Sequence, residues 1–144
     1  MPPVHIFWPV VALAAWTFVV LLIVPIVRVR AHRRKEVRVR DFSLGESANV
    51  PEHVSLPNRN LMNLLEMPVL FYVACLVLYV TGGATYMMTL LAWLYVAARV
   101  AHSLIHMTSN HIPYRMSAFA VSCLALAILW VGAALHMASV SAAG

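Results

Sequence analysis

Charged side chains are scarce in this chain of 144 residues: only 10% are Asp, Glu, Lys or Arg, while 62% of the residues are apolar. An ordinary soluble domain carries about 25% charged residues, and a short one has a large surface to cover with polar groups. The composition therefore argues against a soluble globular domain, a disordered chain and a nucleic-acid-binding protein. Cysteine is also rare, since only Cys75 and Cys123 occur. Two cysteines inside apolar runs exclude a disulfide framework and a thiolate metal site.

Four apolar stretches are long enough to cross a bilayer as helices, for which about 20 residues are needed. They cover about residues 6–27, 61–80, 84–107 and 116–138. Helices are expected because lipid offers no hydrogen-bond partners to an unpaired backbone. We therefore predict an all-α fold: an integral membrane four-helix bundle that forms a single domain over residues 1–144.

Lysine and arginine are missing from both ends of the chain and from the turn at residues 81–83. Seven of the ten basic residues lie within residues 28–40, in a predicted loop over residues 28–60. Because basic loops stay on the cytoplasmic side, we expect this loop in the cytoplasm and both termini outside, as in a bacterial inner membrane. The basic cluster also suits contact with anionic lipid headgroups.

Polar side chains inside apolar helices are costly in lipid and mark candidate functional sites. In this chain they are expected at a similar depth in the bilayer, which we call the polar level. They are Arg59, Asn63 and Glu66 on the second predicted helix, Arg99, His102 and His106 on the third, and Arg115 at the start of the fourth. Within each helix they recur at helical spacing and share one face. Glu66 and Arg99 lie at similar depth on antiparallel helices, so we expect them to form an ion pair.

Two interpretations of this polar level are open. A buried polar network can simply hold four helices together, and Arg115 can extend to phosphate headgroups. The level nevertheless holds more cationic donors than acceptors, and arginine binds carboxylates with a planar fork, which favours a small anionic ligand. His102 and His106 lack a third ligand, so no metal site is predicted.

Residues 59–68 contain an Asn-x-x-Glu signature followed by Pro68, and residues 99–106 contain a polar motif that precedes Arg115. Both resemble the MAPEG family, the membrane-associated proteins in eicosanoid and glutathione metabolism. The resemblance implies a homotrimer of four-helix bundles. It also implies that glutathione binds as a cosubstrate near the cytoplasmic face, between neighbouring subunits.

The resemblance assigns roles to single residues of this chain: glutathione binding to Asn63, Glu66, Arg59, Arg99, His102 and Arg28 (or else Arg30), and catalysis to Arg115 and His106. Where glutathione-using members carry a tyrosine, this chain has His106. Where one branch has a serine after the last-span arginine, this chain has Met116. The match is therefore closer for the binding residues than for the catalytic ones.

The resemblance implies a membrane-embedded glutathione transferase or glutathione-dependent peroxidase that acts on lipophilic electrophiles. Cationic donors would hold glutathione and favour its nucleophilic thiolate, while the bilayer supplies apolar substrates. The expected partners are the lipid bilayer, glutathione, lipophilic small molecules and further copies of the chain. The alternatives are a small proton-coupled multidrug-type transporter that uses Glu66 and a non-catalytic MAPEG-like membrane protein.

Overall fold

The computed structural model describes residues 3–143, and over that range it contains helices but no strand. Its elements are the short 3-10 helices η1 (Pro3–Ile6) and η2 (Val39–Phe42) and the long helices α1 (Phe7–Arg33), α2 (Glu52–Val80), α3 (Tyr86–Met107) and α4 (Ile112–Ala143). All four long helices have the length and apolar composition needed to cross a membrane. The predicted all-α fold with four spans is therefore confirmed, and the protein is an integral, multi-pass membrane protein.

Three of the helices extend beyond the apolar stretches that predicted them. α1 continues past residue 27 to Arg33, α2 begins at Glu52 instead of near residue 61, and α4 begins at Ile112. The predicted loop over residues 28–60 is correspondingly shorter and covers residues 34–51. The apolar stretch measures only the part of a helix that suits lipid, whereas backbone hydrogen bonding continues into the polar ends.

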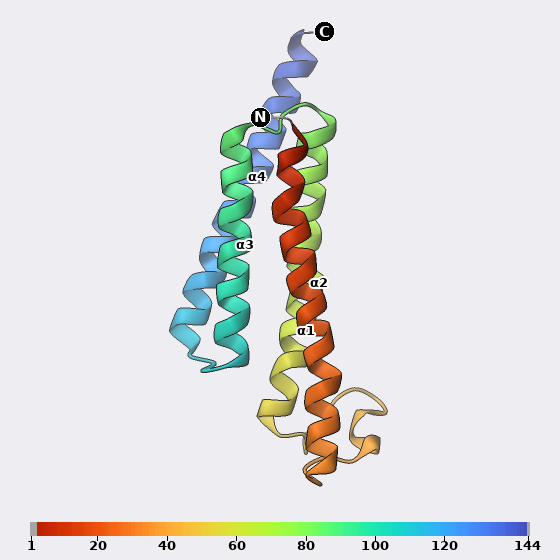
Figure 1. The fold of residues 1–144 in the computed structure, drawn as a ribbon. Helices are drawn as coiled ribbons and strands as arrows, with labels where there is room; N and C mark the ends of the chain where they lie inside the picture. The colour runs from red at the N-terminus through yellow and green to blue at the C-terminus, as the bar shows by residue number, and fades with distance from the viewer. Residues whose placement is uncertain (1–2, 144) are drawn as a thin grey trace.

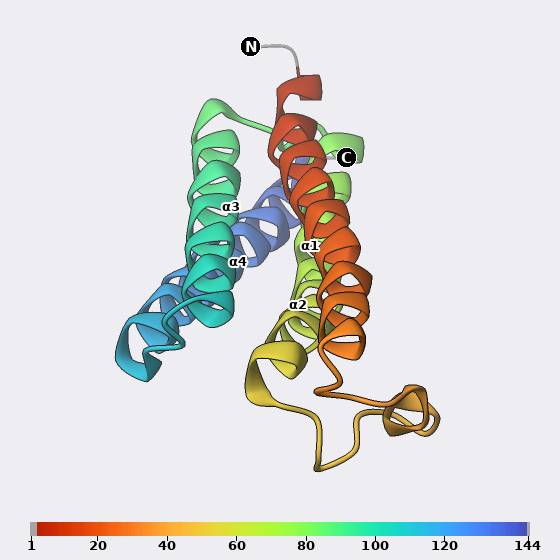
Figure 2. The same ribbon diagram turned by 60° about the horizontal axis from the view of Figure 1, so that its bottom comes forward.

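The helices pack as two pairs, with α1 along α2 and α3 along α4 (Figure 1). Further contacts join α3 to α1 and α2, and α2 to α4. The start of α1, the α2–α3 turn and the end of α4 lie at one end of the bundle, which we call the turn end. The α1–α2 loop and the α3–α4 turn lie at the opposite, loop end, where the long loop extends past α1 and α2 (Figure 2).

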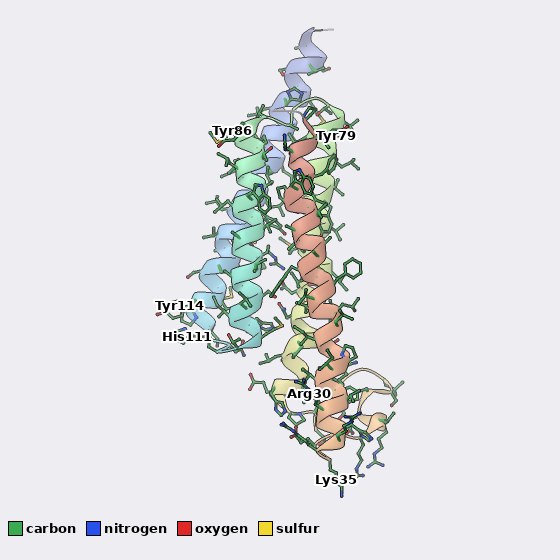
Figure 3. The ribbon with its side chains drawn as sticks, in the orientation of Figure 1. Arg30, Lys35, Tyr79, Tyr86, His111 and Tyr114 are labelled. Carbon is green, nitrogen blue, oxygen red and sulfur yellow. The ribbon has the colours of Figure 1, made fainter. Side chains whose placement is uncertain are left out.

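The interior and the outer surface of the bundle are both largely apolar. Inside, the buried rings of Phe71 and Tyr95 stack with centroids 4.4 Å apart. Outside, large apolar side chains such as Leu124 and Leu135 are exposed, as expected for helices that face lipid. Polar-tipped side chains mark the two ends in Figure 3: Tyr79 and Tyr86 at the turn end, and Arg30, Lys35, His111 and Tyr114 at the loop end.

Candidate functional site

A polar pocket of about 230 Å³ lies between α2, α3 and α4. It is lined by Arg59, Asn63, His102, His106, Arg115, Met116 and Phe119. Five of the residues predicted from the sequence therefore meet at one cavity, because each helix presents its polar face toward the others. None of the lining residues is acidic, so the pocket offers cationic and neutral groups to a ligand.

Arg115, in the first turn of α4, is held by residues of α3 and of the α3–α4 turn. Its Nη1 donates to the Oδ1 of Asn110 at 2.5 Å and to the Nδ1 of His106 at 2.9 Å. Its backbone carbonyl accepts a hydrogen bond from the Nδ1 of His102 at 3.0 Å. Both the backbone and the side chain of Arg115 are thus fixed to α3 and to the turn that follows it.

These contacts define the tautomers of the two histidines. A guanidinium only donates, so the Nδ1 of His106 is unprotonated and its Nε2 carries the proton. A carbonyl only accepts, so the Nδ1 of His102 carries a proton, and in the neutral ring its Nε2 is an acceptor. The two rings stack with centroids 5.9 Å apart. The pair therefore offers one donor and one acceptor.

Arg99 is almost completely buried, with 1% of its surface exposed, and it lies behind the pocket lining. Its Nη2 donates to the backbone carbonyl of Asn63 at 2.8 Å and also to the side-chain oxygen of Asn63. Its Cζ lies 5.7 Å from the ring centroid of Phe119. Within the described residues, Nε and Nη1 have no hydrogen-bond partner. Arg99 is thus a buried cation that orients Asn63 and keeps unused donors.

The predicted ion pair between Glu66 and Arg99 was wrong. Glu66 is exposed, and the salt bridges found within residues 3–143 are Arg28–Glu46 and His53–Glu36. Equal depth on two antiparallel helices does not bring two side chains together, because the rotation of each helix about its axis also decides which side they face. Here α2 presents Asn63 to Arg99. Glu66 lies on the outer part of the polar stripe that Arg59, Asn63 and Glu66 form along α2.

Within one chain, Arg28 lies apart from the polar pocket. Its Nη2 pairs with the Oε1 of Glu46 at 3.1 Å, and its guanidinium lies 4.5 Å from the ring centroid of Phe42. It lines a separate cavity of about 310 Å³ beside the α1–α2 loop. Arg30 is exposed and lines a third cavity, with Glu36 and His53. Neither arginine joins the pocket that contains Arg115.

The sequence did not identify three residues of this region as part of the site, although Met116 was noted where one branch of the family has a serine. Met116 and Phe119 line the pocket one position and one turn after Arg115, and helical spacing from Arg115 would have indicated Phe119. Asn110, in the α3–α4 turn, accepts a hydrogen bond from Arg115. In the sequence, only its position in a short polar segment indicated an unusual backbone conformation. Across residues 3–143 no group of three or more His, Cys, Asp or Glu is placed to hold a metal ion.

The fold and the pocket define the protein as an all-helical integral membrane protein with a cationic cavity between three of its spans. Comparison with known families assigns it more closely. The family model of the MAPEG family matches residues 6–135, nearly the whole chain, and the protein belongs to this family, as the sequence motifs predicted. No curated protein and no solved structure matches the chain.

Proposed function

We propose that this protein binds glutathione in the polar pocket and uses it as a membrane-embedded transferase or peroxidase for lipophilic electrophiles. The observation that carries the proposal is a cavity with Arg59, His106 and Arg115 in its lining and no acidic residue, in a member of the MAPEG family. Glutathione carries two carboxylates and one ammonium group. A cationic lining therefore matches its net charge, and arginine matches the shape of a carboxylate.

The side chains along α2 supply complementary groups for the two ends of the tripeptide. Arg59 is exposed at the pocket and is free to bind a carboxylate, while Glu66 is exposed farther along the same stripe and suits an ammonium group. Asn63 lies between them and is oriented by Arg99. The unused donors of Arg99 add positive potential behind Asn63 and favour an anionic ligand.

The pocket within one chain is smaller than the ~300–1,000 Å³ of most ligand sites. We therefore propose that a neighbouring copy completes the site, in a homotrimer. The exposed Glu66 supports this arrangement, because an exposed carboxylate in the apolar part of a membrane helix is costly unless another subunit covers it. Arg28 lies beside the α1–α2 loop and pairs with Glu46 within the chain, so it would exchange that partner to take part in a neighbour's site.

Arg115 is the residue suited to activate the glutathione thiol. It stands in the first turn of α4, where unpaired amide groups add partial positive charge. A fixed cation there stabilises the thiolate, which attacks the electrophilic carbon and displaces the leaving group, while the thiol proton passes to water. The Nε2 proton of His106 offers a further hydrogen bond to the sulfur, in the position where related enzymes use a tyrosine.

An apolar groove between α1 and α3 supports the choice of a lipophilic substrate. It has a volume of about 700 Å³ and opens on the outer surface of the helices. Its lining includes Trp16, Trp93, Val96, Val100 and Leu104, and contains no charged residue. An apolar compound dissolved in the bilayer can therefore reach the protein without crossing water.

Turnover measurements on protein reconstituted in liposomes test this function. With glutathione present, we expect conjugation of a halogenated nitrobenzene or reduction of a lipid hydroperoxide, and loss of either activity in Arg115→Ala. Arg40→Gln, in the loop and outside the pocket, is the matched control and should behave like the wild type. Proton flux that depends on a lipophilic cation, without turnover, would instead support a transporter. No response in either assay would support a non-catalytic protein.

A further inference from the structure

Asn110 occupies an unusual backbone position in the turn between α3 and α4. Its φ is +47°, in the left-handed region that few residues other than glycine and asparagine adopt readily. Its N–H donates to the carbonyl of Ile105 at 2.8 Å and thereby ends α3. The strained backbone places the side chain of Asn110 between α2 and the first turn of α4.

The Asn110 amide connects two charged groups of opposite sign. Its Nδ2 donates to the Oε1 of Glu52 at 3.1 Å, in the first turn of α2. Its Oδ1 accepts from the Nη1 of Arg115 at 2.5 Å. A carboxylate only accepts and a guanidinium only donates, so the amide can have only one orientation. Because Nη1 also donates to His106, both of its protons are committed.

We propose that Asn110 is a positioning residue for Arg115, and the inference rests on the proposed function of that arginine. Arginine has a long, flexible side chain, and a displacement of about 1 Å from the reacting geometry can cost about 10²-fold in rate. Asn110 and His106 together fix Nη1, which leaves Nη2 and Nε to meet an anion. Glu52 in turn fixes the Asn110 amide, so that α2 takes part in orienting an α4 residue.

The neutral amide also keeps the two charges apart. If a carboxylate contacted Arg115 directly, it would neutralise the cation that the thiolate requires. With Asn110 between them, Glu52 orients the guanidinium through hydrogen bonds and Arg115 retains its charge for a ligand. This explains why an amide, and not the equally small aspartate, suits this position in the turn.

The test compares variants that keep the backbone of the turn. Asn110→Gly tolerates the positive φ and removes only the side chain, whereas Asn110→Asp keeps the shape and places a negative charge on Arg115. Ser109→Ala, at the exposed neighbouring position, is the matched control. For glutathione bound at saturation, we expect the thiolate fraction at neutral pH to fall about threefold in Asn110→Gly and more in Asn110→Asp, with Ser109→Ala unchanged.

Glu52 supplies a conservative rescue. Glu52→Gln keeps an oxygen that can accept from Asn110 and should retain at least half of the wild-type thiolate signal, whereas Glu52→Ala should resemble Asn110→Gly. A purely structural role would lower the amount of folded protein without changing the thiolate fraction of the glutathione that still binds. That result, or equal signals in all these variants, would overturn the proposal.

A second readout needs no glutathione. In protein labelled with ¹⁵N-histidine, we expect His106 of the wild type to show an unprotonated Nδ1, and Asn110→Gly to show a mixture of tautomers because Arg115 is no longer held. If the wild type binds no glutathione but the tautomers still mix, the proposed function fails while the positioning of Arg115 stands. An unchanged His106 spectrum in Asn110→Gly would contradict the positioning itself.

Discussion

The turn end and the loop end of the bundle use polar groups in opposite ways. At the turn end, the Nε2 of His136 donates to the carbonyl of Thr81 at 2.9 Å, and a Cβ added at Gly83 would lie only 2.6 Å from the His136 ring. At the level of the pocket nearer the loop end, Arg99 keeps two buried nitrogens that have no hydrogen-bond partner among residues 3–143. Side-chain packing thus fills the turn end, whereas the pocket level keeps buried hydrogen-bond donors that are not used within the chain. Such unused donors are typical of a ligand site.

The largest expected difference between the two ends is their accessibility. We propose that the loop end faces the cytoplasm, where glutathione is made, and that the turn end faces outward. In a background without Cys75 and Cys123, Leu44→Cys should resist an impermeant thiol reagent in intact cells, and Ser141→Cys should react fully. Both positions are exposed, so burial does not explain a difference. The reverse labelling pattern would move the pocket to the other compartment.

Removing the fixed cation of the pocket should have the next largest effect. Arg115→Ala deletes the group that stabilises the thiolate, and loss of one such donor costs about 10²–10³-fold in kcat. Binding of glutathione should weaken only modestly, since Arg59 and Asn63 remain. Steady-state kinetics together with equilibrium binding separate the two effects. Equal losses in binding and in kcat/KM, with kcat unchanged, would show that Arg115 serves binding alone.

Removing the charge of Glu66, on the outer part of the polar stripe, should have a smaller effect on glutathione binding. Glu66→Gln keeps the shape of the side chain but removes the charge that suits the glutathione ammonium group, so affinity should fall about tenfold, or ~1.4 kcal/mol. Insertion and assembly should be unchanged, which size-exclusion chromatography in detergent would show. Asp41→Asn, whose carboxylate accepts a hydrogen bond from the backbone N–H of Arg38 in the loop, is the control on a carboxylate outside the pocket. Wild-type affinity in Glu66→Gln would remove Glu66 from the site.

The turn end should affect stability and leave the chemistry unchanged. Gly83→Val would force its side chain against His136 and Leu78, and such overpacking costs about 1–3 kcal/mol. We expect a lower Tm with normal glutathione affinity in the folded fraction. Gly82→Asn, at a positive φ with nothing near its Cβ position, should change Tm much less. Loss of glutathione affinity in folded Gly83→Val would mean that the two ends are coupled.

The sequence predicted the helices well because a bilayer demands length and apolar composition, which can be counted. It also predicted most of the pocket, since a spacing of four residues puts Arg59 with Asn63 and His102 with His106 on common faces. It failed for Glu66 and Arg99, because periodicity within one helix does not give its rotation against the next. The role proposed for Asn110 depends on a turn conformation that no periodic pattern encodes.

The ultraviolet difference spectrum of the detergent-solubilised wild type, titrated with glutathione, measures whether the protein binds glutathione and ionises its thiol. We expect a saturable thiolate band at neutral pH, because the fixed charge of Arg115 lowers the pKa of the bound thiol. S-methylglutathione, which binds through the same carboxylates but has no thiol proton, should compete for the site and give no band. Absence of the band in wild-type protein that is saturated with glutathione would show that Arg115 does not stabilise a thiolate.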